Sequence, residues 1–109
     1  MVHPGQKLRF EIVTPEERLY QDNAWQVVLP AAQGAIGILP QHAPMVILLQ
    51  SGIVYIYQDE DTLSERIFVG GGFAHIDEEN CTVMADEAIR VSDIKETEVQ
   101  DYIDKIHAE

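Results

Sequence analysis

Short segments in which apolar and polar residues alternate are the feature that most constrains this fold. Residues 8–13 (LRFEIV) place Leu8, Phe10 and Ile12 on one side with charged residues between them, and residues 24–30 (AWQVVLP) repeat the alternation. A period of two residues is typical of a β-strand that buries one face. The alternation therefore predicts strands over both segments.

Further β-rich segments follow at intervals of about ten residues, which is the strand spacing of sandwiches and barrels. They are residues 45–49 (MVILL), 53–58 (IVYIYQ), 66–76 (RIFVGGGFAHI), interpreted as two short strands around a glycine cluster, and 81–85 (CTVMA). The turn-forming runs QDEDT (58–62) and DEEN (77–80) separate them. We predict a mainly β fold over residues 1–91, a two-sheet antiparallel β-sandwich of about ten short strands.

The sequence changes to a helical period after residue 91. The apolar residues of one helical face are Val99, Tyr102, Ile103 and Ile106. Asp93 followed by Glu96 resembles a capping box. We predict one short C-terminal α-helix within a separate helical segment, residues 92–109. Such a short helix is marginal alone, so we expect it to pack on the sheet or on a partner.

The charge of the chain excludes several classes of function. Its 109 residues carry 19 acids and 7 bases, a formal net charge of −12. That field repels phosphate backbones and anionic lipid, which disfavours nucleic-acid binding. The longest apolar run, residues 43–49, is too short to span a membrane, and the N-terminus lacks the apolar stretch of a signal peptide. We expect a soluble, cytosolic chain with no direct membrane insertion.

One part of the chain is free of formal charge. Residues 23–58 contain no Asp, Glu, Lys or Arg, and the acids collect in later turns and in the tail. If Val54, Ile56 and part of residues 45–49 face outward, they form an exposed apolar patch larger than a monomer usually tolerates. The pattern therefore favours a module that binds another protein.

Residues 31–45 (AAQGAIGILPQHAPM) lie inside this uncharged region. Two glycines and two prolines exclude a helix or a central strand, yet the side chains between them include Ile36, Ile38 and Leu39. A solvent loop is usually more polar. We interpret the segment as a rigid loop that another protein covers, and we expect burial of its apolar side chains, rather than charge, to drive docking.

No metal site or catalytic group is indicated by residue spacing. The histidines are His3, His42, His75 and His107, and none lies at short ligand spacing from another His or from Cys. Cys81 has no basic sequence neighbour to lower its pKa, and the adjacent pair Asp86 and Glu87 lacks an accompanying nucleophile. We therefore expect no metal, no cofactor and no enzymatic activity.

The glycine cluster at residues 70–72 could in principle cradle a phosphate. The chain after it continues as the strand pattern FAHI instead of opening a helix, so the usual anion-binding geometry is missing. Glycines within a strand pattern mark a bulge or a point where another backbone comes very close. We favour this structural interpretation.

Four segments resemble one family. LRFEIVTPEERLYQD, QGAIGILPQHAPM, VGGGFAHI and CTVMADEAIR stand in the order and spacing of the epsilon subunit of bacterial and chloroplast F-type ATP synthases, which is homologous to the mitochondrial delta subunit. The resemblance covers residues 7–95. Its most specific part is the run G-x-x-G-I-x-P-x-H-A-P from Gly34 to Pro44.

The resemblance implies a non-catalytic subunit of the rotating central stalk, which links the gamma subunit to the c-ring and couples proton flow to ATP synthesis. The catalytic alpha and beta subunits are further candidate partners, and the location is peripheral, on the cytoplasmic face of the bacterial inner membrane. The implied c-ring-facing loop is Gln33, Gly34, Ala35, Ile36, Gly37, Ile38, Leu39, Pro40 and Gln41. The implied gamma-facing residues are Thr14, His42, Ile47, Ile53 and Gly70.

The sequence departs from the family pattern in three places. Ala35 stands where the family often has a charged residue, and Gly70 replaces a common serine. Family members usually carry two longer C-terminal helices that can inhibit hydrolysis, whereas only one short, truncated helical segment follows the sandwich here. Where ATP-binding tails show I/L-D-x-x-R-A, Lys95 and Glu98 replace the acid and the arginine. We expect weak or absent helix-mediated inhibition and no nucleotide binding by the tail.

A small cupin-like barrel metalloenzyme is the alternative interpretation. It requires clustered His and Glu ligands at strand spacing, a pattern that this sequence lacks. A zinc or iron assay on the purified protein distinguishes the two.

Overall fold

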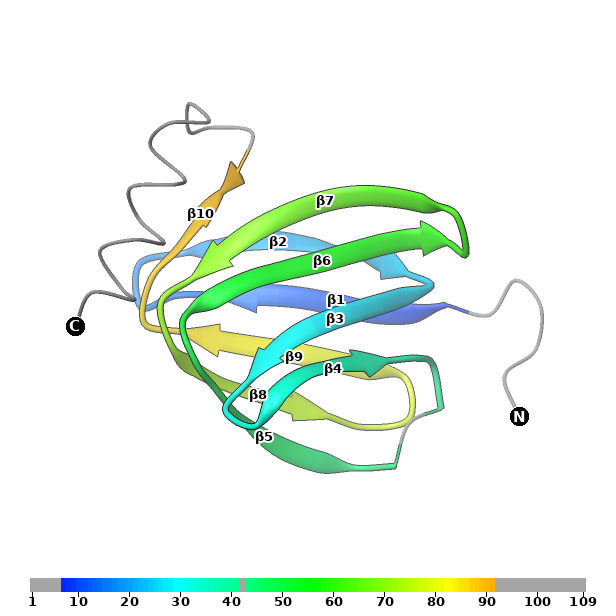
Figure 1. Cartoon of the computed structure of the whole chain (residues 1–109), viewed down its shortest axis with the longest axis horizontal. Coiled ribbons are helices and arrows are strands. Elements are labelled where there is room, and N and C mark those ends of the chain that lie inside the picture. The colour runs from blue at the N-terminus through cyan, green and yellow to red at the C-terminus, as the bar shows by residue number, and fades with distance from the viewer. Residues whose placement is uncertain (1–6, 42, 92–109) are drawn as a thin grey trace.

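The computed structural model describes residues 7–41 and 43–91, which form ten strands. The strands are β1 (Leu8–Val13), β2 (Arg18–Ala24), β3 (Gln26–Ala31), β4 (Gly34–Ile38), β5 (Met45–Leu49), β6 (Gly52–Asp59), β7 (Thr62–Val69), β8 (Gly72–Ile76), β9 (Asn80–Ala85) and β10 (Ala88–Arg90). The predicted mainly β fold of about ten short strands is confirmed (Figure 1). The predicted C-terminal helix lies outside the described residues, as do His3, His42 and His107.

The strands wrap into a single sheet that folds over on itself. One half has the order β4-β3-β6-β7-β10 and the other β5-β8-β9-β1-β2. A single residue pair, Ala31 opposite Leu49, joins the halves where β3 meets β5. The predicted pair of separate sheets is thus corrected to two layers that remain connected along one edge, and the core lies between the layers (Figure 1).

The prediction of a wholly antiparallel sandwich was also wrong at one position. Strand β1 pairs in parallel with β9, with Phe10 opposite Cys81. The neighbour of β1 on its other side, β2, follows it directly in sequence and pairs antiparallel. Strands β2 to β8 separate β1 from β9 in the sequence. A connection of this length allows β9 to pair with β1 in either a parallel or an antiparallel orientation.

Two acidic turns lie where the sequence predicted them. Asp59 ends β6 and its Oδ1 accepts a hydrogen bond of 2.9 Å from the amide of Asp61. Asp77 follows β8 and its Oδ1 accepts bonds of 3.0 Å and 2.9 Å from the amides of Glu79 and Asn80. These amides stabilise the ionised carboxylates and lower the pKa of both Asp59 and Asp77.

Strand β4 corrects the interpretation of residues 31–45 as a loop. Gly34–Ile38 pairs antiparallel with β3 and forms a hairpin closed by the turn at Ala32 and Gln33. Gly34 has a φ of +126°, which glycine adopts without strain. Within the described residues β4 pairs with β3 alone, and such an edge position tolerates glycine better than a central one. Glycine and proline therefore excluded a central strand correctly, but not an edge strand.

The core contains the alternate side chains of nearly every strand. The largest fully buried ones are Phe10, Phe68, Leu8, Ile12, Leu29, Ile38, Ile56, Ile67, Ile76, Val27, Val54 and Val69. Within the described residues no polar or charged side chain is buried. The expectation that Val54 and Ile56 face outward was wrong, because both are fully buried and Tyr55 between them is exposed instead.

The glycine cluster confirms a close approach between strands. Gly71 and Gly72 have φ angles of +86° and +115°. A Cβ atom on Gly72 would overlap the carbonyl oxygen of Met84 and lie 2.9 Å from the Cα of Ala85. The amide of Gly70 donates a hydrogen bond of 2.9 Å to the carbonyl of Glu87. The cluster thus has a structural role where β8 meets β9.

Candidate interaction surface

The β3–β4 hairpin is fastened to the end of β5. The amide of Ala32 in the turn donates to the carbonyl of Leu48 at 3.0 Å, and the amide of Gln50 donates to the carbonyl of Pro30 at 2.8 Å. Both bonds lie beside the pair of Ala31 and Leu49 that joins the two halves of the sheet. The hairpin tip is therefore held by backbone bonds on the β5 side.

A groove of about 500 Å³ lies between this hairpin and β5. We call it the hairpin groove. Its lining residues are Ala31, Ala32, Gln33, Gly34, Ala35, Ile36, Met45, Val46, Ile47 and Leu48. In Figure 1 the two strands that form its walls, β4 and β5, leave a common corner at the hairpin turn. No lining residue carries a formal charge, so the groove offers apolar contact and backbone polar groups.

Large apolar side chains are exposed beside the groove. Val46 is 64% exposed and Leu48 is 68% exposed on β5, whereas Ile47 between them is buried. Phe73 on β8 lies opposite Leu48 and is 44% exposed. With Met45, which is 37% exposed, they form what we call the β5–β8 patch. The prediction that part of residues 45–49 faces outward is confirmed.

The nine residues expected in the c-ring-facing loop do not form one surface. The exposed members are Gln33, Gly34, Ala35, Gly37 and Gln41, and the half-buried members are Ile36 and Leu39. Pro40 is buried and Ile38 is fully buried in the core. The expectation that Ile38 drives docking was therefore wrong, because Ile38 already packs inside its own domain.

Gln41 lies away from the hairpin turn. Its amide donates a hydrogen bond of 2.6 Å to the carbonyl of Glu78, and its φ is +65°. This bond places Gln41 beside the β8–β9 turn, while Gln33 lies in the β3–β4 turn at the opposite end of β4. The two ends of the expected loop are thus separated by the whole of β4.

The residues expected to face gamma divide into two groups. Ile47 lines the hairpin groove, together with part of the expected ring-facing set. Thr14, Ile53 and Gly70 lie at the end of the sheet where β1 and β7 finish and β6 begins. Thr14 is fixed there by a bond of 2.8 Å from its amide to the carbonyl of Glu17. His42 lies outside the described residues.

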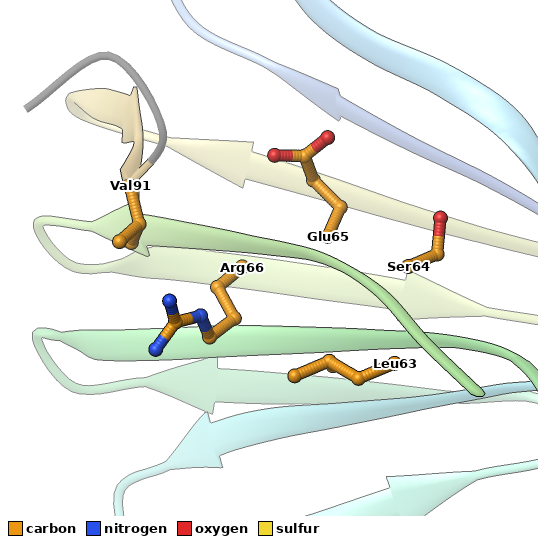
Figure 2. Close-up of a pocket in the computed structure, with 5 residues that line it drawn as sticks. All are labelled: Leu63, Ser64, Glu65, Arg66 and Val91. Atoms are coloured by element: carbon orange, nitrogen blue, oxygen red, sulfur yellow. The ribbon is translucent and has the colours of Figure 1, made fainter. Parts of the chain in front are cut away.

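A second pocket, of about 310 Å³, lies along β7 and was not foreseen from the sequence. Its lining residues are Leu63, Ser64, Glu65, Arg66 and Val91 (Figure 2). In Figure 2 the carboxylate of Glu65 points away from the guanidinium of Arg66. The partner of Glu65 is instead Arg90, with 3.3 Å between Oε2 and the guanidinium nitrogen. No sequence signal connects Glu65 with Arg90, because 25 residues separate them.

Arg90 also ties together strands from opposite edges of the sheet. Its guanidinium donates to the carbonyl of Leu19 on β2 at 2.9 Å and lies 5.5 Å from the centre of the Tyr20 ring. Burial raises the pKa of Tyr20, and the nearby carboxylates of Asp22 and Glu65 raise it further. The second pocket therefore lies beside the contacts through which Arg90 on β10 joins β7 and β2.

The lone cysteine lies in the core. Cys81 lies on β9 and is fully buried, and this burial raises the pKa of its thiol to about 12. The thiolate needed for nucleophilic attack is therefore scarce at neutral pH. Over residues 7–41 and 43–91, no three His, Cys, Asp or Glu side chains gather as a metal site, and no helix is long and apolar enough to cross a membrane.

Comparison with known families decides between the two interpretations of the sequence. Residues 7–91 match the family described as ATP synthase, Delta/Epsilon chain, beta-sandwich domain. The chain belongs to this family. The matched delta/epsilon sandwich covers all ten strands, and the cupin-like alternative is set aside.

Curated bacterial relatives of this delta/epsilon chain are named ATP synthase epsilon chain. The relative from Granulibacter bethesdensis is 49% identical over 90 residues, which are 83% of this chain and 66% of that protein. The relative from Rhodospirillum centenum is 48% identical over 83 residues, 75% of this chain and 57% of that protein. The match thus spans less than two thirds of the length of these relatives.

Solved structures share the delta/epsilon fold at low identity. A chain in the mitochondrial ATP synthase of Euglena gracilis (OSCP/F1/c-ring) superposes with a TM-score of 0.78 at 18% identity, covering 98% of this chain and 68% of that one. A chain in the central stalk and c-ring structure of Tetrahymena thermophila gives 0.63 at 15% identity, covering 94% and 90%. At these identities the likeness concerns the fold alone.

Proposed function

We propose that this chain is a non-catalytic rotor subunit of an F-type ATP synthase, which links the gamma subunit to the c-ring and couples proton flow to ATP synthesis. Membership of the delta/epsilon family supports the proposal. The observation that carries it is the uncharged hairpin groove with the adjoining β5–β8 patch. A soluble protein that acts as a monomer without a partner rarely exposes a contiguous apolar surface of this kind.

Burial of apolar area supplies the affinity in this proposal. Covering an exposed Leu or Val side chain completely contributes about 1.5 to 3 kcal/mol, whereas an exposed ion pair contributes at most about 1 kcal/mol. The patch provides Val46, Leu48, Phe73 and Met45 on adjoining strands. The docked state should therefore resist salt, in agreement with the absence of charge between residues 23 and 58.

The acidic remainder of the surface favours contact with water. In this proposal the chain stays at the membrane only because its partners hold it there. Acidic residues occupy the β6–β7 and β8–β9 turns, away from the hairpin turn. With a net charge of −12, the chain is repelled by anionic headgroups. We place it on the cytoplasmic face of the bacterial inner membrane as a peripheral subunit, held there by gamma and the c-ring, with the alpha and beta subunits as further neighbours.

Transmission of torque requires a docking element that does not yield. The hairpin meets this need, because two backbone bonds fasten it to β5 and to the residue after it, from the amide of Ala32 to the carbonyl of Leu48 and from the amide of Gln50 to the carbonyl of Pro30. Ile38 at the end of β4 and the half-buried Ile36 pack it onto the core. The strand form of β4 thus replaces the rigid loop that the sequence suggested, with the same mechanical consequence.

The test is association of the purified chain with the gamma subunit from the same organism, measured by titration calorimetry at low and high salt. We expect binding that persists at high salt and that Leu48→Asp weakens at least about tenfold, since one buried Leu is worth more than a tenfold change in affinity. Leu63→Asp is the matched control, because Leu63 is also exposed but lies on β7 beside the second pocket. Loss of binding with added salt, or equal effects of the two variants, contradicts the proposal.

A further inference from the structure

Strand β10 has few contacts of its own with the rest of the domain. It consists of three residues, all of them half-buried, and pairs with β7 along one side. Of these three residues, Ala88 packs against the hydrophobic core. Strands β10 and β2 lie at the two ends of the strand path that the structure describes, so no backbone ladder joins them. A short strand with so little buried area is expected to open before the rest of a domain does.

The side chain of Arg90 connects β10 to β2 across this open side of the sheet. Its guanidinium donates a hydrogen bond of 2.9 Å to the carbonyl of Leu19 on β2 and one of 3.3 Å to Glu65 on β7. It also lies 5.5 Å from the centre of the Tyr20 ring, which is within the range of a cation–π contact. Arginine presents its donors in a rigid planar fork, so a single side chain reaches all three partners.

Strand β2 is shaped to receive this guanidinium. In the ladder between β1 and β2 the register shifts after Ile12, and Leu19 is left without a residue opposite it. A residue left out in this way is the extra residue of a β-bulge, so the carbonyl of Leu19 is available to Arg90. The Tyr20 ring is held in place, because it is buried and its centre lies 6.0 Å from that of the Phe10 ring.

The contacts of Arg90 are partly shielded from water. The side chains of Arg90 and Glu65 are 34% and 21% exposed, so salt screens their attraction less than that of a fully exposed pair. Hydrogen bonds from an ionised donor are also stronger than those between neutral groups. The side chain of this one residue therefore contributes much of what holds β10 to the domain.

We propose that Arg90 is a latch that holds β10 in place as a detachable strap. When the guanidinium leaves Leu19 and Glu65, β10 separates from β7 as a unit and the other strands stay folded. Only Val91 separates β10 from residues 92–109 in the sequence, so the latch fixes the start of that segment to the sandwich. The latch belongs to this chain alone and does not depend on which partner the chain binds.

Amide hydrogen exchange of the full chain, followed by NMR at single residues, measures the opening of β10 separately from that of the domain. The amide of Gly70 donates to the carbonyl of Glu87. By the alternation of an antiparallel ladder, the next hydrogen-bonded pair is Ile89 with Phe68. The amide of Ile89 therefore reports on β10. The amide of Ala74 is the reference, because its strand β8 is paired on both sides, with β5 and with β9.

Arg90→Met removes the latch and keeps a long side chain. We expect it to raise the exchange rate at Ile89 at least about tenfold more than at Ala74, because a general loss of stability would raise both rates alike. Arg66→Met is the matched control, since Arg66 is an exposed arginine on the neighbouring strand β7, and it should leave the ratio of the two rates unchanged. Equal acceleration at Ile89 and Ala74, or none at Ile89, overturns the latch.

Trypsin provides a second measurement, because it cuts after Arg and Lys and cuts within a paired strand only when that strand opens. Arg90→Lys keeps a cleavable residue but lacks the planar fork, and Glu65→Gln removes one partner while leaving Arg90 itself unchanged. We expect mass spectrometry to detect fragments that end at residue 90 at least about fivefold sooner from both variants than from the parent. Glu65→Gln also keeps the test decisive if Arg90→Met does not fold. Cleavage at residue 90 at the parent rate in both variants overturns the latch.

Discussion

Gly72 shows how strongly a single residue can be constrained in this fold. Two separate conditions apply to it, a φ of +115° and a carbonyl oxygen of Met84 in the place where a Cβ would lie. Gly34 meets only the first condition, because its φ is +126° but open space surrounds the Cβ position. The two glycines therefore allow backbone strain to be measured apart from steric overlap.

We expect Gly34→Ala to lower the free energy of unfolding by about 1 to 3 kcal/mol, the usual cost of an unfavourable φ. Gly72→Ala should cost more, about 4 kcal/mol or above, because β8 and β9 must also separate locally. Urea denaturation of both variants provides the measurement. Equal losses for the two would show that the overlap with Met84 is relieved without strain.

Asp77 makes the stability of the β8–β9 turn depend on pH. Its folded pKa lies below the ordinary value, because the amides of Glu79 and Asn80 donate to the ionised carboxylate. A depressed folded pKa means that the contribution is complete above the unfolded pKa of about 4 and is lost as pH falls through the folded value. Near neutral pH the turn should therefore be fully stabilised.

The corresponding variant is Asp77→Ala, which we expect to be less stable than the parent at neutral pH. The difference should shrink as pH falls below about 4, since the parent then loses the same bonds. Glu78→Ala is the control, because it removes a neighbouring exposed acid of equal charge. Thermal melting across the pH range checks this, and a difference that stays constant into acid would contradict it.

At the scale of elements, clear alternation predicted both the strand and its buried face. Strand β1 matches residues 8–13 because Leu8, Phe10 and Ile12 are its buried face. Strand β6 is apolar on both faces, so its sequence could not tell which side Val54 and Ile56 occupy. Strand β2 buries only Tyr20 and Ala24, and its polar edge composition gives no alternation to detect.

The interaction surface was predictable only in part. The uncharged run from residue 23 to 58 contains the whole hairpin groove and three of the four side chains of the β5–β8 patch. Phe73 was not foreseen, because its contact with the surface depends on pairing between β5 and β8. Ile38 was assigned to docking because it lies in a segment rich in Gly and Pro, which did not predict a strand. In the structure this segment includes β4, and the side chain of Ile38 on β4 is buried in the core.

Substitution by Asp at two positions distinguishes a core residue, Ile38, from a residue of the proposed docking surface, Leu48. Ile38→Asp places a charge in the core and should lower the free energy of unfolding by about 4 kcal/mol or more, enough to unfold a domain of this size. Leu48→Asp changes a side chain that is 68% exposed and should stay within about 0.5 kcal/mol of the parent. Circular dichroism melts check both. A folded Ile38→Asp variant would mean that β4 does not pack as described.

At the scale of the whole molecule, charge is separated from the docking surface. The uncharged region ends at Gln58, and acids follow in the turns and in the tail. In residues 92–109 the acids are Asp93, Glu96, Glu98, Asp101, Asp104 and Glu109. The bases there are Lys95 and Lys105. Six acids against two bases give this segment a net negative charge, and we expect it to inhibit hydrolysis weakly.

Hydrolysis by a catalytic subcomplex of alpha, beta and gamma tests that expectation. We predict nearly the same ATP hydrolysis rate with the parent chain and with a variant from which residues 92–109 are deleted, because we expect weak or absent helix-mediated inhibition from this segment. Strong inhibition that disappears with the deletion would show that residues 92–109 hold the rotor by contacts other than basic ones.

In our proposal the uncharged surface around the hairpin couples the rotor. It is tested most directly by proton-driven ATP synthesis in membrane vesicles whose ATP synthase has been depleted of its epsilon subunit. We expect the parent chain and Leu63→Asp to restore synthesis equally, while Leu48→Asp at the same concentration restores little because it docks poorly. Full restoration by Leu48→Asp, or none by the parent chain, would show that this surface does not couple the rotor.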